Sequence, residues 1–165
     1  MNTLLSPNNA VDLVPPPGLP PIGCEGGELV RALMAVGIKH ELGCRGPVKF
    51  DCYAMMQLVQ WHLFGRVVSS IDLGADASGR AVLSALALNR TRRAWRLNAG
   101  RPRHGDAVTM SHMHEPFHIG TFLDIDRGVV VHCASFAGLV CDDTAALRAS
   151  GWGKICFYSY RGAAS

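Results

Sequence analysis

The first half of the chain repeats apolar residues at the spacing of amphipathic helices. Residues 28–36 follow this pattern up to Gly37, and residues 52–64 follow it up to Gly65. Glycine directly after the last apolar position is typical of a helix end. Residues 79–97 are apolar at first and Arg-rich later, which predicts another helix. The pattern therefore predicts three helices before residue 100.

The second half has a different pattern, in which runs of β-branched and aromatic residues are separated by turn residues. Strands are expected in four ranges: 105–110, 117–125, 129–132 and 154–160. A short helix is expected over 143–150, with Asp143 or Thr144 as its N-cap. Helices that precede antiparallel strands indicate an α+β fold, with the N-terminal helices packed on a small antiparallel β-sheet.

Residues 1–23 form a separate segment, because six of the nine prolines lie there. Proline lacks an amide donor and is excluded from helix and sheet interiors. We therefore divide the chain into an extended arm, 1–23, and one domain, 24–165. The arm is apolar and carries one charged residue, Asp12, which favours a stiff strap laid in the groove of a partner. The alternative is a lid over Cys52. As a strap, the arm should be dispensable for folding and for chemistry.

The composition is that of one globular domain, with 165 residues, 48% apolar and 18% charged. The net charge of +3 does not require an anionic partner. Because the charge is modest, we do not expect nucleic acid binding. No apolar run reaches the ~20 residues of a membrane span, so we do not expect membrane insertion. The start of the chain lacks the pattern of a secretory signal. The six irregularly spaced cysteines are therefore expected to stay reduced, in a protein made in the cytoplasm.

Basic residues are concentrated in residues 90–103, which hold six arginines around Trp95. Arginine interleaved with an aromatic residue is typical of nucleic-acid-binding surfaces, yet the rest of the chain has no such bias. We expect this Arg-rich segment to contact a protein or an anionic cell-wall surface. The alternative is an ordinary solvated helix end.

Three residues combine into a candidate for nucleophilic catalysis. Cys52 begins a predicted helix, where free amides and the positive end of the helix dipole favour a thiolate. His118 opens a strand and is placed to act as a base, and His132 ends the following strand, where it is placed to orient His118. The alternative is structural, because a lone helix cysteine is often a small buried hydrophobe and a strand histidine is often a satisfied polar residue.

Four short motifs in this order resemble the NlpC/P60 family of cysteine peptidases over about residues 27–160. The motifs are Phe50-Asp51-Cys52, Gly105-Asp106, His118-Ile119-Gly120 and Val131-His132-Cys133-Ala134. The resemblance implies a papain-like α+β fold, with Cys52 as nucleophile, His118 as base and His132 as the third residue. It also implies hydrolysis of peptide bonds in the stem peptides of bacterial peptidoglycan, commonly next to D-glutamate.

The segment from His118 to Asp124 and the ending from Leu147 to Tyr158 are similar to the small NlpC/P60 proteins of siphophage tail tips. This similarity implies a virion protein, made in the host cytoplasm, that acts in tail assembly and cell-wall penetration. Its expected partners are peptidoglycan and other tail-tip proteins, contacted through the arm and the Arg-rich segment. The alternatives are a mainly structural tail-tip protein with latent or lost activity, and a secreted toxin amidase of the same superfamily.

Two positions depart from the family pattern. Tyr53-Ala54 replaces Ser-Gly after the nucleophile, which places a bulkier wall near the site. His40 stands where many members have a tyrosine that helps to hold the substrate or the oxyanion. We expect His40 to be a surface residue, with hydrogen-bond donation in place of that tyrosine as the alternative.

A second cluster of histidines raises the question of a metal. His104, His112, His114 and His118 are close in sequence, with Cys133 and Cys141 downstream. Their spacing fits no usual zinc-ligand pattern, and His118 is already assigned to catalysis. We therefore expect no metal site and no cofactor.

Overall fold

The computed structural model describes residues 12–68, 94–112 and 118–162. The helices and strands within these ranges, in chain order, are α1 (Gly26–Val36), β1 (Lys39–His40), β2 (Lys49–Phe50), α2 (Cys52–Phe64), β3 (Trp95–Asn98), β4 (Ala107–Ser111), β5 (His118–Leu123), β6 (Val129–Ala134), β7 (Gly138–Asp142), α5 (Thr144–Ala149) and β8 (Lys154–Tyr160). Helices come first and most strands follow, as the hydrophobic pattern predicts.

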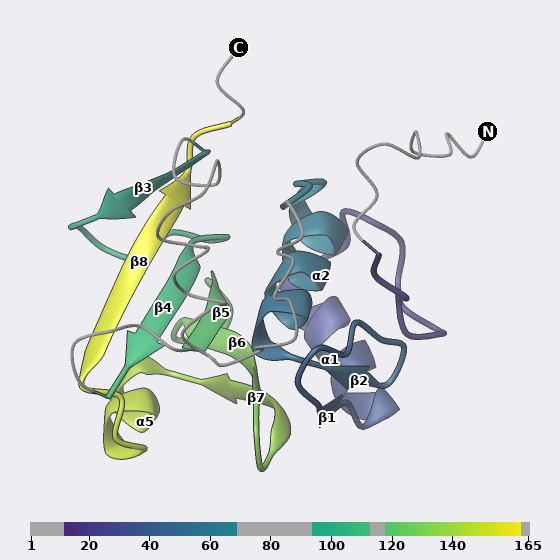
Figure 1. Ribbon diagram of the computed structural model, residues 1–165. Helices are drawn as coiled ribbons and strands as arrows, with labels where there is room; N and C mark the ends of the chain where they lie inside the picture. Colours follow the sequence, from purple (N-terminus) through teal and green to yellow (C-terminus); the bar gives the residue numbers. More distant parts are fainter. Residues whose placement is uncertain (1–11, 69–93, 113–117, 163–165) are drawn as a thin grey trace.

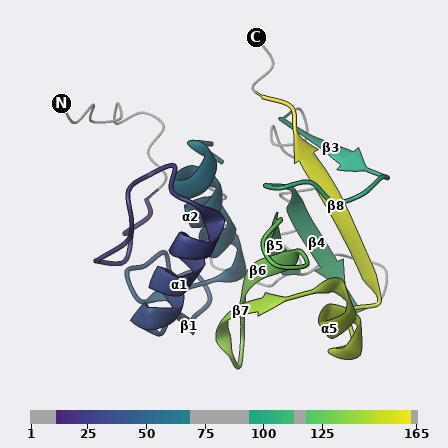
Figure 2. The same ribbon diagram turned by 180° about the vertical axis from the view of Figure 1, so that it is seen from behind.

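Six strands form one antiparallel sheet in the order β3-β8-β4-β5-β6-β7, and β1 and β2 form a separate parallel pair. In both views α2 lies between the sheet and α1 (Figures 1 and 2). Helix α2 contacts β5 and β6, the two strands that carry the candidate histidines. The prediction of an α+β fold with N-terminal helices on an antiparallel sheet is therefore confirmed.

Helix α2 is the central element of the helical layer. It begins and ends where the sequence predicts, after Asp51 and before Gly65, whose φ of 63° suits glycine. Ten of its thirteen residues are buried, because the sheet covers one side and α1 the other. An all-round apolar helix of this kind is typical of the centre of a domain.

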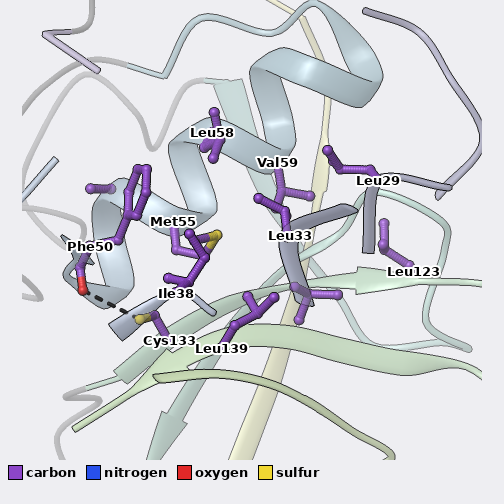
Figure 3. Packing of buried hydrophobic residues seen from close by; sticks show 12 residues of the cluster. Leu29, Leu33, Ile38, Phe50, Met55, Leu58, Val59, Leu123, Cys133 and Leu139 are labelled. Atoms are coloured by element: carbon purple, nitrogen blue, oxygen red, sulfur yellow. Dashed lines mark hydrogen bonds between the residues drawn. The ribbon is translucent and has the colours of Figure 1, made fainter. Parts of the chain in front are cut away.

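The main hydrophobic core lies between the two helices and the sheet (Figure 3). It joins Leu33 of α1, Val59 of α2 and Leu123 of β5. On the sheet side, Cys133 donates its thiol to the carbonyl oxygen of Phe50 over 3.3 Å. Burying each large apolar side chain contributes about 1.5–3 kcal/mol, so this core holds α2 firmly against β5 and β6.

A smaller core lies on the opposite face of the sheet, under α5. Its buried members are Val108, Met110, Phe122, Val130 and Leu147. Side chains alternate between the two faces of a strand, so the even-numbered positions of β5 and β6 share this face. His118 and His132 are among those positions. The odd-numbered positions, such as Ile119, face α2 instead.

The structure differs from the predicted helix over residues 79–97. Residues 79–93 lie outside the described part of the chain, and residues 95–98 form strand β3. Trp95 pairs with Tyr160 and stacks on it edge-on, at 5.1 Å between ring centroids. Apolar and polar residues alternate in the sequence Trp-Arg-Leu-Asn, which suits a strand. Pairing with β8 satisfies the backbone hydrogen bonds that a helix would otherwise satisfy internally.

The described part of the proline-rich arm, residues 12–23, lies against the chain's own domain. It contains no helix or strand, as its prolines predict. Leu13 and Leu19 pack on the main core, and Pro16 is buried. The expected contact with a neighbouring protein therefore stays a prediction for residues 1–11, which lie outside the described part.

Hydrogen bonds attach both ends of this arm segment. The N–H of Val14 donates to the carbonyl oxygen of Arg45 over 2.9 Å. Farther along, His62 of α2 bonds the carbonyl oxygen of Pro20 through Nε2 over 2.7 Å, and Gly23 N–H donates to the carbonyl oxygen of His62. The arm thus belongs to the folded unit over these residues, which changes what its removal should do.

Neither disulfides nor membrane-spanning helices contribute to the described fold. All six cysteines lie in described residues, and all are free thiols. Among the described helices, none has both the length and the apolar character that crossing a bilayer requires. The described fold is therefore held together by its three hydrophobic clusters and its hydrogen bonds.

Candidate functional site

Asp51 fixes the point at which α2 begins. Its Oδ1 accepts a hydrogen bond from the N–H of Ala54 over 2.7 Å, which caps the helix. Its Oδ2 accepts from the N–H of Gly43 over 3.1 Å, which ties the preceding loop to the same point. Cys52 is consequently held as the first residue of α2, as the sequence predicts.

The Cys52 side chain is enclosed by apolar neighbours from the helix and the sheet. It is 8% exposed and packs with Tyr53, Met56, Val68 and Ile119. Ile119 follows His118 directly in β5, but its side chain faces α2, whereas the side chain of His118 lies on the Trp152 side of the sheet. The described contacts therefore join Cys52 to the residue after the predicted base and not to the base itself. Tyr53 is itself buried, which confirms that a bulky side chain lines this region.

The electrostatics of Cys52 differ from the prediction of a thiolate. Burial, together with the negative charge of Asp51, raises the pKa of the thiol to about 12. The backbone amides of Ile119, Tyr53 and Cys52 itself lower this pKa, but they do not offset burial. At neutral pH the thiol is therefore protonated, and its activation requires a base.

His118 and His132 are joined by a direct hydrogen bond. Strands β5 and β6 pair with Gly120 opposite His132, so His118 lies diagonally across on the same face. The distance from His118 Nε2 to His132 Nδ1 is 2.8 Å. Gly120 makes this approach possible, because a Cβ there would stand 2.7 Å from the carbonyl oxygen of Val131 and 3.0 Å from His132 Cβ.

Asp142 extends this pair into a chain of three residues. It lies on β7, diagonally across from His132, and its Oδ2 is 3.3 Å from His132 Nε2. A carboxylate only accepts hydrogen bonds, so His132 carries its proton on Nε2 and accepts at Nδ1. His118 must then donate from Nε2, which leaves its Nδ1 unprotonated. Asp142 thus sets the tautomers of both histidines.

The surroundings keep both imidazoles neutral. Burial, together with the nearby imidazoles of His132, His40 and His112, lowers the pKa of His118 to about 3. Burial also lowers the pKa of His132, although its hydrogen bond to Asp142 acts in the opposite direction. A neutral His118 with a free Nδ1 is the form that a general base requires.

This burial predicts an acid-sensitive fold. In the unfolded chain His118 has a pKa of about 6.5, whereas in the folded protein it is about 3. Between these values the unfolded state binds one more proton, so the free energy of unfolding falls as the pH falls below 6.5. The slope from His118 alone is up to about 1.4 kcal/mol per pH unit.

Urea unfolding at pH 7, 6 and 5 measures that slope. His118→Gln has no titrating imidazole at this position and is the matched control. Its unfolding free energy should change less steeply with pH than that of wild type, because the contribution of His118 is missing. If wild type and His118→Gln show the same slope, His118 is not buried in its neutral form.

Sequence reasoning identified His118 and His132 but missed two residues that contact them. Asp142 was missed because β7 was not predicted as a strand. Trp152, which lies outside all four motifs, stacks on the ring of His118 at 5.1 Å between centroids. His40 is half-buried rather than on the surface, and β1 pairs it with Phe50, two residues before Cys52.

The remaining candidates lie apart from this site. Arg96, Arg101 and Arg103 of the Arg-rich segment are exposed, and residues 90–93 lie outside the described part. His104 accepts a hydrogen bond from the N–H of Asp124. Within the described ranges, no three His, Cys, Asp or Glu side chains are grouped so that they would hold a metal ion.

Neither protein-family models nor curated protein sequences give a match to this chain. The resemblance to NlpC/P60 peptidases therefore rests on the four motifs and on the arrangement of their residues. In that arrangement, His118 and His132 are directly bonded, and Cys52 contacts the residue after His118.

Proposed function

We propose that this protein is a cysteine peptidase of the NlpC/P60 type with a papain-like fold. In this proposal Cys52 is the nucleophile, His118 the base and His132 the residue that orients the base. The proposal is supported chiefly by the hydrogen-bonded chain from Asp142 through His132 to His118, which leaves Nδ1 of His118 unprotonated. The buried thiol at that helix start is the group such a base would activate.

The reaction begins with two neutral groups. As the Cys52 sulfur bonds to the substrate carbonyl carbon, its proton passes to His118 Nδ1, and the amide of Cys52 donates to the developing oxyanion. The C–N bond then breaks, and His118 returns the proton to the leaving amine. Water, deprotonated by His118, hydrolyses the thioester and restores the thiol. His132 and Asp142 hold the ring of His118 in position while it carries the proton.

The proposed substrate is the peptide portion of bacterial peptidoglycan, and the proposed location is the tail tip of a phage virion. Support for both comes from the resemblance of the motifs to the NlpC/P60 proteins of siphophage tail tips. The exposed arginines Arg96, Arg101 and Arg103 suit contact with an anionic cell wall or with another tail protein. Neither nucleic acid nor membrane insertion has a part in this proposal.

Mass analysis of purified peptidoglycan after incubation with the protein tests the proposal. Wild type is expected to release stem-peptide fragments, and Cys52→Ala is expected to release none. Cys156→Ala is the matched control, because Cys156 lies on β8 and pairs with Thr109, away from α2. Equal release by wild type and Cys52→Ala, or no release by wild type, would overturn the assignment.

A second candidate function is structural, as a tail-tip protein whose hydrolase activity is latent. The observation that favours it is the state of Cys52, which is 8% exposed and has a pKa of about 12. Under this alternative, wild type and Cys52→Ala would both be inactive on peptidoglycan, and Cys52→Ala would still assemble into infectious tails.

A further inference from the structure

The indole of Trp152 stacks on two imidazoles. Its ring is stacked on that of His118, with centroids 5.1 Å apart and planes 10° apart. On His112 the centroids are 4.3 Å apart and the planes 7° apart. The three residues come from separate segments: His112 follows β4, His118 begins β5, and Trp152 follows α5. We call them the stacked column.

His112 is held by the loop that carries Trp152. His112 Nδ1 is 2.7 Å from the carbonyl oxygen of Gly151, so the ring donates its proton to that loop. The glycines on both sides of Trp152 fit closely around His112. A Cβ on Gly151 would lie 3.5 Å from its ring, and one on Gly153 would lie 3.2 Å from its carbonyl oxygen.

Trp152 is also held by the smaller core under α5. Trp152 packs against the cluster of Val108, Met110, Phe122, Val130 and Leu147. Its backbone N–H donates to the carbonyl oxygen of Leu147 over 3.1 Å. Trp152 is therefore anchored through α5 to the sheet face on which His118 and His132 lie.

Two independent constraints thus act on the His118 ring. The hydrogen bond from Nε2 to His132 fixes one ring nitrogen but still allows the ring to tilt about that bond. A flat indole against one face removes that freedom, because stacked rings stay nearly parallel. Together the two contacts determine both the position of Nε2 and the plane of the imidazole.

We infer that Trp152, which also stacks on His112, is a positioning residue that keeps the imidazole of His118 in one plane and its Nδ1 in one direction. This inference rests on the proposed role of His118 as a base, and it adds two residues that none of the four motifs contains. Trp152 does not react with substrate in this scheme, since it acts through His118. His112 acts through Trp152.

Replacement of Trp152 by leucine tests this role. The variant keeps an apolar side chain for the core but removes the flat face, so we expect turnover to fall about 10-fold with little change in KM, because an outer positioning contact is lost. Trp152→Phe should recover most of the turnover. Trp61→Leu on α2 is the matched control, because Trp61 packs on the other core, and it should leave turnover unchanged.

A second measurement does not depend on turnover. Nitrogen-15 NMR of the imidazole side chains, with His118→Gln for assignment, reports the tautomer and the titration of His118. In wild type we expect a single neutral tautomer down to pH 5. In Trp152→Leu and His112→Ala we expect exchange between tautomers and protonation at a higher pH. His112→Ala leaves the core intact, so it serves if Trp152→Leu does not fold.

The two measurements separate the inference from the proposed function. If wild type hydrolyses peptidoglycan and Trp152→Leu and His112→Ala match it in turnover and in NMR, the positioning role is wrong. If wild type is inactive but both variants show tautomer exchange of His118 and its protonation at a higher pH, the column positions His118 and the peptidase assignment fails.

Discussion

His118→Ala is expected to lower peptidase turnover by about 10³-fold to 10⁴-fold, because a general base contributes that much. The loss should be this large because Cys52, with a pKa of about 12, cannot ionise by itself at neutral pH. His132→Ala should cost less, about 10-fold to 100-fold, since it removes an orienting partner and leaves Nδ1 of His118 in place. Steady-state rates on a soluble muropeptide provide the comparison.

His132→Asn is the informative control in this series. An asparagine oxygen can accept the hydrogen bond from His118 Nε2, so this variant should retain more activity than His132→Ala. Circular dichroism must show native folds for all three variants. If His132→Ala is as inactive as His118→Ala while folded, the roles of base and orienter are wrongly divided between them.

Deleting residues 2–22 is expected to destabilise the domain, contrary to what the prolines alone suggest. The deletion removes Leu13 and Leu19 from the main core and removes the hydrogen bonds to Arg45 and His62. We expect a loss of about 2–4 kcal/mol of unfolding free energy, and a Tm lower by roughly 5–15 °C. Thermal unfolding followed by circular dichroism measures this shift.

A shorter deletion, of residues 2–11, is the matched control because it keeps every described contact of residues 12–23. It should leave the Tm nearly unchanged. If both deletions melt like wild type, the arm contributes nothing to stability and the strap on a partner becomes the better description. A full deletion that is more active than wild type would instead identify the arm as a lid over Cys52.

The local parts of the fold follow from the sequence. Helix α2 has both of its boundaries where the apolar period, Asp51 and Gly65 place them, and α5 begins after Asp143, whose Oδ1 accepts from Ala146 N–H. These signals lie within a few residues of the elements that they define. Strand β8 was predicted with the same bounds, because its aromatic and β-branched residues are contiguous.

The parts that could not be predicted depend on contacts between distant segments. Strand β3 follows an Arg-rich run and becomes a strand because it pairs with β8, more than fifty residues later. In the same way, Asp142 is an ordinary loop-edge aspartate until β7 pairs with β6 and brings its carboxylate to His132. Nothing in the sequence predicts that Trp152 stacks on His118. Hydrophobic periodicity and helix-capping residues report only on neighbours along the chain.

Gly120 is expected to tolerate substitution as poorly as the catalytic residues do. It bears no reactive group, yet any side chain there would collide with Val131 and His132 and push β5 and β6 apart. A saturation scan selected on activity should therefore rank Gly120 with Cys52 and His118, ahead of Asp142. The positions that such a scan marks as essential for activity would therefore include one that matters only because it has no side chain.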